Sequence, residues 1–116
     1  TTGKYGLTEV YLLSSPFRRV VEAVEYAAKD HGLRVFVHGE DSTRADWEFE
    51  KKFINAVAEA GAECYRVCDT VGVGLSDIDA PLPNGIPAKI KAIKYETKIK
   101  GIDIDELERK EHENIL

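Results

Sequence analysis

Two short polar segments contain the residues best suited to chemistry. The first, residues 38–46, includes Glu40 and Asp41, and the second begins with Asp69-Thr70. If the chain brought these three carboxylates together, proximity would raise the pKa of one of them for acid–base work, or the group would collect a divalent cation. The types and spacing therefore indicate a candidate site shared by two segments.

A structural interpretation of the same residues stays open. Asp41 and Asp46 can cap a helix that follows them, and Glu40 can pair with Arg44. His38 could act as a proton shuttle or a ligand, although a single histidine at a strand end is more often a hydrogen-bonded core residue. Spacing alone does not decide between a site and a capped turn.

Three apolar segments are expected to position these residues. Residues 7–13, 33–38 and 63–68 have the composition of buried strands, and each is followed by a helix-like pattern. Strands that recur about every 26 to 30 residues with helices between them require right-handed crossovers and a parallel sheet. Because ligand sites lie at the carboxyl ends of parallel strands, Ser14 and Ser15 and both polar segments fall at the expected edge.

The helices between these strands are predicted from apolar residues that recur at helical spacing. The predicted buried stripes are Val20, Val21, Val24, Ala27 and Ala28; Phe49, Phe53, Ala56, Val57 and Ala60; and Ile86, Ile90, Ile93 and Thr97. Either the capping pattern Thr43-x-x-Asp46 or Asp46 itself is expected to cap the second helix, and Gly32, Gly61 and Gly101 to end the three helices. Residues 102–116 fit either a strand or a charged helix.

Composition excludes several classes of protein. The 116 residues, 43% hydrophobic and 32% charged, suit one globular domain spanning residues 1–116, with no linker and no apolar run of the roughly 20 residues that a membrane span needs. A net charge of -5 without a basic cluster argues against nucleic acid as a partner. Cys64 and Cys68 would lie about 13 Å apart in a strand, too far for a disulfide, so we expect reduced thiols and a cytoplasmic protein.

The two polar segments resemble motifs of a known enzyme family. Glu40-Asp41-Ser42-Thr43-Arg44-Ala45-Asp46 and Asp69-Thr70-Val71-Gly72 are similar to the E-D-x-x-R-[SA]-D and D-T-[VM]-G motifs of isopropylmalate, homocitrate and Re-type citrate synthases. The segment Pro81-Leu82-Pro83-Asn84-Gly85-Ile86-Pro87 resembles a proline-rich stretch in one branch of this family. The resemblance covers roughly residues 7–100.

The resemblance implies a fold and an activity. The family has the (β/α)8 TIM barrel shared with pyruvate carboxyltransferases and HMG-CoA lyase, and this chain would supply strands three to six, about half a barrel. A small doubly wound α/β domain is the alternative. The implied function is that of an acyltransferase that condenses acetyl-CoA with a 2-oxo acid in amino-acid biosynthesis, with the isolated segment inactive. The alternative function is a non-catalytic α/β module that binds an anion or forms oligomers.

The resemblance also implies roles for individual residues. Glu40 matches an acidic residue of the substrate pocket and is the candidate catalytic residue, and Thr70 matches a threonine that hydrogen-bonds the substrate carboxylate. Arg44 matches a position that holds the loop, and with His38 and Asp69 it completes the candidate substrate-binding set.

Two positions depart from the family pattern. Phe36 stands where many members have an arginine. The family binds a divalent metal (Mg, Mn or Zn) through an aspartate of strand one and a His-x-His pair of strand six, and here only His112 is available, with Lys110 in the place of the first histidine. We therefore predict at most a weak metal site at His112. Homo-oligomerisation is expected, because half a barrel leaves open strand edges.

Overall fold

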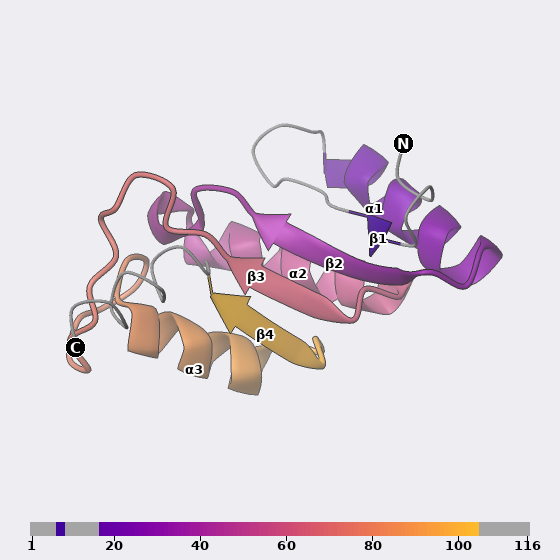
Figure 1. Ribbon diagram of the computed structural model, residues 1–116. Coiled ribbons are helices and arrows are strands. Elements are labelled where there is room, and N and C mark those ends of the chain that lie inside the picture. The colour runs from indigo at the N-terminus through magenta and orange to yellow at the C-terminus, as the bar shows by residue number, and fades with distance from the viewer. Residues whose placement is uncertain (1–6, 9–16, 105–116) are drawn as a thin grey trace, which may run out of the picture.

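The fold is a parallel sheet covered by helices. The computed structural model describes residues 7–8 and 17–104, which form strands β1 (Leu7–Thr8), β2 (Arg34–Gly39), β3 (Cys64–Val67) and β4 (Gly101–Ile104). All pairings are parallel and the order is β1-β2-β3-β4, as Figure 1 shows. The predicted α/β class and chain-order strands are confirmed, and the order is compatible with a partial barrel rather than a reversal between the described strands.

Helices alternate with the strands as predicted. They are α1 (Phe17–Glu25), which continues as a π-helical turn over Tyr26–Asp30, α2 (Trp47–Ala60) and α3 (Ile86–Glu96). Figure 1 shows α2 behind β2 and β3, and α3 beside β4. The positions of Ser14 and Ser15 lie outside the described residues.

Local sequence chemistry explains both ends of α2. The Asp46 side chain accepts a hydrogen bond from the backbone N–H of Phe49 at 3.0 Å, which confirms the predicted cap. Gly61 follows the helix with φ of 116°, a left-handed conformation that a residue with a side chain rarely adopts. These two residues place the start of β3 close behind the end of α2.

The core lies between the helices and one face of the sheet. Val35, Val37, Tyr65 and Val67 alternate along β2 and β3, are fully buried, and pack with the helices in one cluster. The cluster also contains seven of the predicted stripe residues: Val20, Val24, Ala27, Phe53, Val57, Ala60 and Ile93. The side chains that alternate along the strands and those at helical spacing thus pack together in one apolar layer.

One predicted stripe is partly wrong. Phe49 is 45% exposed and contacts Phe17 only edge-to-face at the rim, with 5.8 Å between ring centroids. Ala56 is half-buried, whereas Glu50 and Ile54 are fully buried. The buried face of α2 is therefore rotated from the predicted one, because a charged residue, Glu50, occupies a core position.

The segment whose structure the sequence left undecided is partly described. Gly101–Ile104 forms β4, which pairs in register with β3, and residues 105–116, including Lys110 and His112, lie outside the described residues. Cys64 is half-buried and Cys68 is buried, and the Cys68 thiol donates to the Arg66 carbonyl at 3.8 Å. Within the described residues, no helix is long and apolar enough to cross a membrane.

The face of the sheet opposite the helices is more polar. Phe36, Cys64, Arg66 and Asp103 are half-buried there. Arg66 and Asp103 are partners in register, and Arg66 Nη2 donates to Asp103 Oδ2 at 3.1 Å. In a closed barrel this face would be the interior, so the register places a charged pair below the carboxyl ends of β3 and β4.

Candidate functional site

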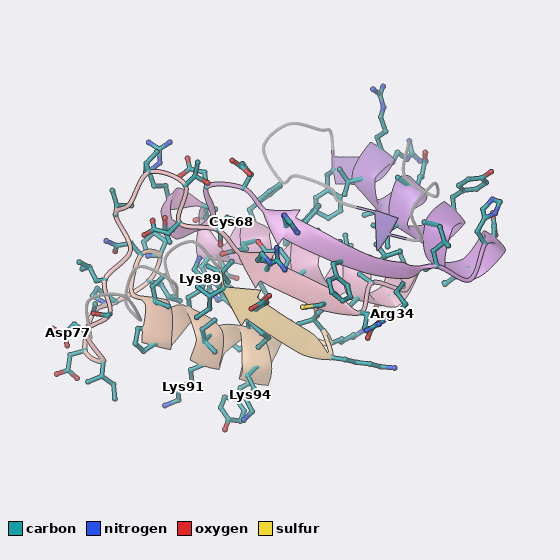
Figure 2. All side chains as sticks on the ribbon, viewed as in Figure 1. Arg34, Cys68, Asp77, Lys89, Lys91 and Lys94 are labelled. Carbon is teal, nitrogen blue, oxygen red and sulfur yellow. The ribbon has the colours of Figure 1, made fainter. Side chains whose placement is uncertain are left out.

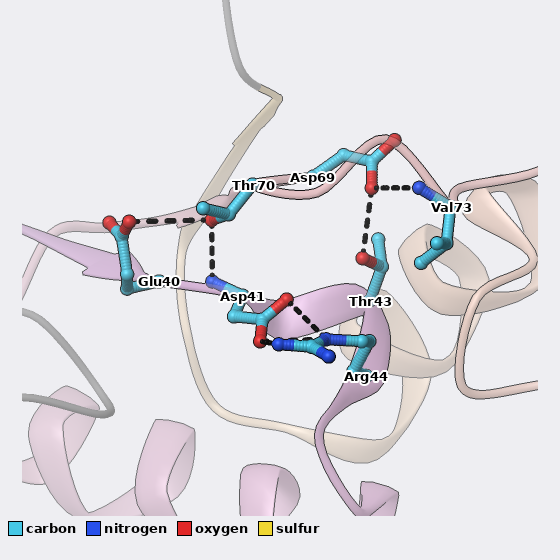
Figure 3. A network of polar contacts seen from close by, with 7 residues as sticks. All are labelled: Glu40, Asp41, Thr43, Arg44, Asp69, Thr70 and Val73. Carbon is cyan, nitrogen blue, oxygen red and sulfur yellow. Dashed lines mark hydrogen bonds and ion pairs between the residues drawn. The ribbon is translucent and has the colours of Figure 1, made fainter.

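The two polar segments meet beyond the carboxyl ends of β2 and β3. Glu40 directly follows β2, and Thr70 follows β3 by three residues. The backbone N–H of Asp41 donates to Thr70 Oγ1 at 2.8 Å, and Thr70 Oγ1 donates to Glu40 Oε1 at 3.4 Å (Figure 3). The parallel register therefore brings Glu40 and Thr70 together at one end of the sheet.

The hydrogen bonds of Thr70 leave its proton available. Because the Asp41 N–H occupies the hydroxyl oxygen as an acceptor, the O–H must point elsewhere, toward Glu40 or toward an incoming oxygen. A 3.4 Å contact is at the long end of hydrogen bonding, so a ligand oxygen can replace it at small cost. Thr70 is exposed and Glu40 is half-buried, so a small anion can reach both.

Asp69 organises the loops. Its Oδ1 accepts hydrogen bonds from Thr43 Oγ1 at 2.9 Å and from the backbone N–H of Val73 at 3.0 Å (Figure 3). Its Oδ2 accepts from the N–H of Gly74 at 3.0 Å. A side chain at Gly74 would place its Cβ 2.7 Å from Asp69 Oδ2. Both carboxylate oxygens are thus engaged by the protein, and the substrate-binding role expected of Asp69 stays a prediction.

Arg44 pairs with Asp41 rather than with Glu40. Arg44 Nε donates to Asp41 Oδ1 at 2.9 Å and Oδ2 at 2.8 Å, and its Nη2 also contacts Oδ2. Asp41 has φ of 59°, which turns its side chain back over the 3₁₀ turn Ser42–Arg44. Hydrogen bonding to Arg44 lowers the pKa of Asp41 against the opposing effect of burial. The interpretation in which Glu40 pairs with Arg44 is therefore wrong, and Glu40 faces Thr70.

His38 is buried near the carboxyl end of β2. It is paired in register with Arg66 of β3, so both residues lie on the face of the sheet opposite the helices. This position is below Glu40, inside the edge where the two loops meet. The structure agrees with a core position for His38, and its substrate-binding role stays a prediction.

Sequence reasoning missed a buried polar cluster beneath the site. This cluster, here called the Lys89 cluster, consists of Ser42, Glu50, Tyr65 and Lys89, and all four are fully buried. Tyr65 Oη donates to Glu50 Oε2 at 2.7 Å, the Ser42 hydroxyl donates to the same oxygen, and Lys89 Nζ pairs with Glu50 Oε1. Burial, with the nearby Glu50 carboxylate, raises the pKa of the Tyr65 phenol well above its ordinary value, so Tyr65 remains a donor.

Lys89 differs from the other lysines of α3. Its side chain points toward the sheet, whereas those of Lys91 and Lys94 point away from it (Figure 2). Lys89 Nζ also lies 5.5 Å from the centre of the Trp47 ring, a cation–π contact. One signal could have revealed the pair, because Lys89 falls three residues after Ile86 and Glu50 three before Phe53, so both charges lie on predicted apolar faces.

The described residues do not fit a metal site. Among them, no three or more His, Cys, Asp or Glu side chains are grouped so that they could hold a metal ion. Asp41 is engaged by Arg44, and Asp69 by Thr43 and two backbone N–H groups. His112, the one metal ligand predicted from the sequence, lies outside the described residues.

Comparisons with known proteins identify relatives of the chain. It is 37% identical over 76 residues to a homocitrate synthase of Sulfolobus acidocaldarius, a match that covers 60% of this chain and 16% of that protein. It is 49% identical over 55 residues to a 2-isopropylmalate synthase of the same organism, covering 47% and 14%. It is 51% identical over 53 residues to an (R)-citramalate synthase of Methanocaldococcus jannaschii, covering 46% and 11%.

These matches are partial, since the chain spans between 11% and 16% of the length of these three relatives. No family model matches it. The three relatives are nevertheless all named as synthases of the group that the two loop motifs resemble. Over the matched segment the chain is therefore similar to citramalate, isopropylmalate and homocitrate synthases.

Proposed function

We propose that this chain supplies the substrate-carboxylate edge of a (β/α)8 barrel that condenses acetyl-CoA with a 2-oxo acid. The observation that carries the proposal is the contact between Thr70 Oγ1 and Glu40 Oε1, which joins the two motif loops at the carboxyl ends of adjacent strands. The similarity of the segment to homocitrate, isopropylmalate and citramalate synthases supports it. Residues 1–116 would form part of this barrel, and the complete barrel would be a single domain.

Two residues would act on the substrate. The Thr70 hydroxyl, with its oxygen held by the Asp41 N–H, would turn its proton from Glu40 to the substrate carboxylate. Glu40, released from that contact, would accept a proton or a hydrogen bond at the adjacent reacting centre. Arg44 and Asp69 would act indirectly, because they hold the loops from which Glu40 and Thr70 project.

The other parts of the reaction, including metal binding, would need residues from the rest of the barrel. A divalent metal would polarise the keto oxygen of the 2-oxo acid when bound. The described residues lack a ligand set for it, so no step proposed for this chain passes through a metal. We propose that the chain alone binds a 2-oxo acid weakly in the cytoplasm, without completing the reaction with acetyl-CoA.

Binding of 2-oxo acids tests the role of Thr70. Titration of the chain with 2-oxoisovalerate, 2-oxoglutarate or oxaloacetate, followed by NMR shifts of the loop amides, is expected to show saturable binding of at least one acid. Thr70→Val should weaken it roughly 10- to 100-fold, since a hydrogen bond to a charged group contributes about 1.5–3 kcal/mol. Glu40→Gln should alter the loop shifts with a smaller loss of affinity.

The matched control is Thr97→Val at the end of α3. The Thr97 hydroxyl donates to the Ile93 carbonyl near the amino end of β4, away from the two loops, so this variant should bind the acid as the parent chain does. Equal losses in both variants would contradict the assignment of Thr70. Release of CoA from acetyl-CoA by the isolated chain would contradict the proposal that its site is incomplete.

We also propose that the isolated chain self-associates. Half a barrel presents open strand edges and leaves its inner face, with Phe36 and Cys64, half-buried. Light scattering over a tenfold concentration range is expected to show a mass that rises with concentration. A constant monomer mass together with a sharp cooperative melt would overturn this proposal.

A further inference from the structure

The Lys89 cluster touches the candidate site through one residue, Ser42. Lys89 Nζ donates to the backbone carbonyl of Ser42 at 3.1 Å, and the Ser42 hydroxyl donates to Glu50. The Ser42 N–H in turn donates to the carbonyl of Cys68 at 3.1 Å, which ties the first loop to the segment after β3. Ser42 is therefore held at its backbone carbonyl, its backbone N–H and its side chain.

From Ser42 the contacts continue to the two site residues. Asp41, the neighbour of Ser42, donates its N–H to Thr70 Oγ1, and Thr70 contacts Glu40. The position of the Thr70 proton thus depends on where the Asp41 N–H points, and that depends on how Ser42 is fixed. A path of hydrogen bonds, joined by the backbone between Ser42 and Asp41, runs from α2 and α3 to the site.

The cluster is costly if stability alone is considered. Two charges without solvent contact lose their hydration, and replacing a buried ion pair with apolar residues of similar volume is often neutral or stabilising. Apolar side chains at positions 50 and 89 could fill the same core. They could not donate to the Ser42 carbonyl or accept from the Ser42 hydroxyl, which is what this ion pair specifically supplies.

We infer that Lys89 and Glu50 are positioning residues that lock the Ser42 turn and thereby hold Glu40 and Thr70 in the geometry that binds the 2-oxo acid. The part of this inference that concerns the ligand rests on the proposed function. The part that concerns the loop does not, because it can be measured without a ligand.

The test is a variant that makes the cluster apolar, Glu50→Leu/Tyr65→Phe/Lys89→Met. Its thermal stability is expected to equal or exceed that of the parent chain, while the Ser42 carbonyl, left without a donor, turns toward water. The amide protons of Asp41 and Ser42 should then exchange on the order of tenfold faster, as expected for weakened hydrogen bonds, with the amides of β2 and β3 unchanged. Loop amides as protected as in the parent chain would overturn the inference.

A second variant keeps the test decisive if the triple variant does not fold. Glu50→Gln/Lys89→Met is nearly isosteric and keeps an acceptor for the hydroxyls of Tyr65 and Ser42, so faster exchange of the same two amides is expected. The control is Arg34→Ala/Glu63→Ala, an exposed ion pair at the amino ends of β2 and β3. This double variant should leave the exchange rates of the Asp41 and Ser42 amides unchanged. An equal increase of these rates in the control would also overturn the inference.

Measurements of 2-oxo acid binding distinguish a failure of this inference from a failure of the proposed function. If the parent chain binds 2-oxoisovalerate, the apolar variant should bind it on the order of tenfold more weakly, as expected for the loss of about one well-formed hydrogen bond. If the parent chain binds none of the 2-oxo acids, the proposed function fails, and amide exchange still decides whether Lys89 and Glu50 hold the loop. Retained affinity in a variant with loosened loop amides would overturn the claim that this lock serves binding.

Discussion

Lys89→Met alone is expected to destabilise the protein by roughly 3–5 kcal/mol, the cost of leaving one member of a buried ion pair without its partner. Glu50 and Lys89 are both 0% exposed, so the remaining carboxylate cannot recover solvation without opening the core. Small domains are stable by only about 5–15 kcal/mol, so much of the stability would be lost. Urea unfolding followed by circular dichroism and Trp47 fluorescence measures the change.

Lys91→Met provides the matched control. Lys91 lies two residues further along α3 and is exposed, so its replacement should change the stability by less than about 0.5 kcal/mol. Adding Glu50→Leu to Lys89→Met should restore part of the loss, because the unpaired carboxylate is removed. Equal stabilities of the two single lysine variants would show that the pair does not contribute as its burial implies.

The features that could be predicted from the sequence are those set by local chemistry. Asp46 caps α2 because its carboxylate reaches an N–H three residues ahead, and Gly61 ends the helix because it accepts a positive φ. The order of the strands followed from their spacing, which leaves room for one crossover helix each. The meeting of Glu40 and Thr70 followed from the same parallel arrangement and from the loop motifs.

The features that could not be predicted depend on partners far apart in the chain. Lys89 and Glu50 are separated by 39 residues, and although each falls on a predicted apolar face, only the tertiary structure shows that the two meet at 0% exposure. The partner of Arg44 was missed for a local reason. The left-handed conformation of Asp41 turns its carboxylate toward Arg44, and non-glycine residues adopt this conformation too rarely for a sequence pattern to indicate it.

Gly39→Ala is expected to destabilise the protein by about 2–5 kcal/mol, the sum of overpacking and a lost buried hydrogen bond. A Cβ at Gly39 would lie 1.9 Å from Tyr65 Oη and 2.5 Å from Cζ, so it would overlap the hydroxyl end of the side chain. Tyr65 is 0% exposed and its hydroxyl donates to Glu50, so the ring cannot turn away without breaking the Lys89 cluster. The absence of a side chain at Gly39 is thus what allows a tyrosine hydroxyl to reach Glu50.

A double-mutant cycle tests this cause. Tyr65→Val empties the space that the new Cβ would enter, so Gly39→Ala should add little to the loss that Tyr65→Val causes alone, and the two changes should be strongly non-additive. Gly72→Ala is the comparison, since a Cβ at Gly72 meets nothing within 4 Å and its cost of about 1–2 kcal/mol comes from a φ of 72°. That cost should be the same with Tyr65 or Val at position 65. Additive losses for Gly39→Ala and Tyr65→Val in chemical denaturation would mean that overlap with the ring is not what excludes a side chain at position 39.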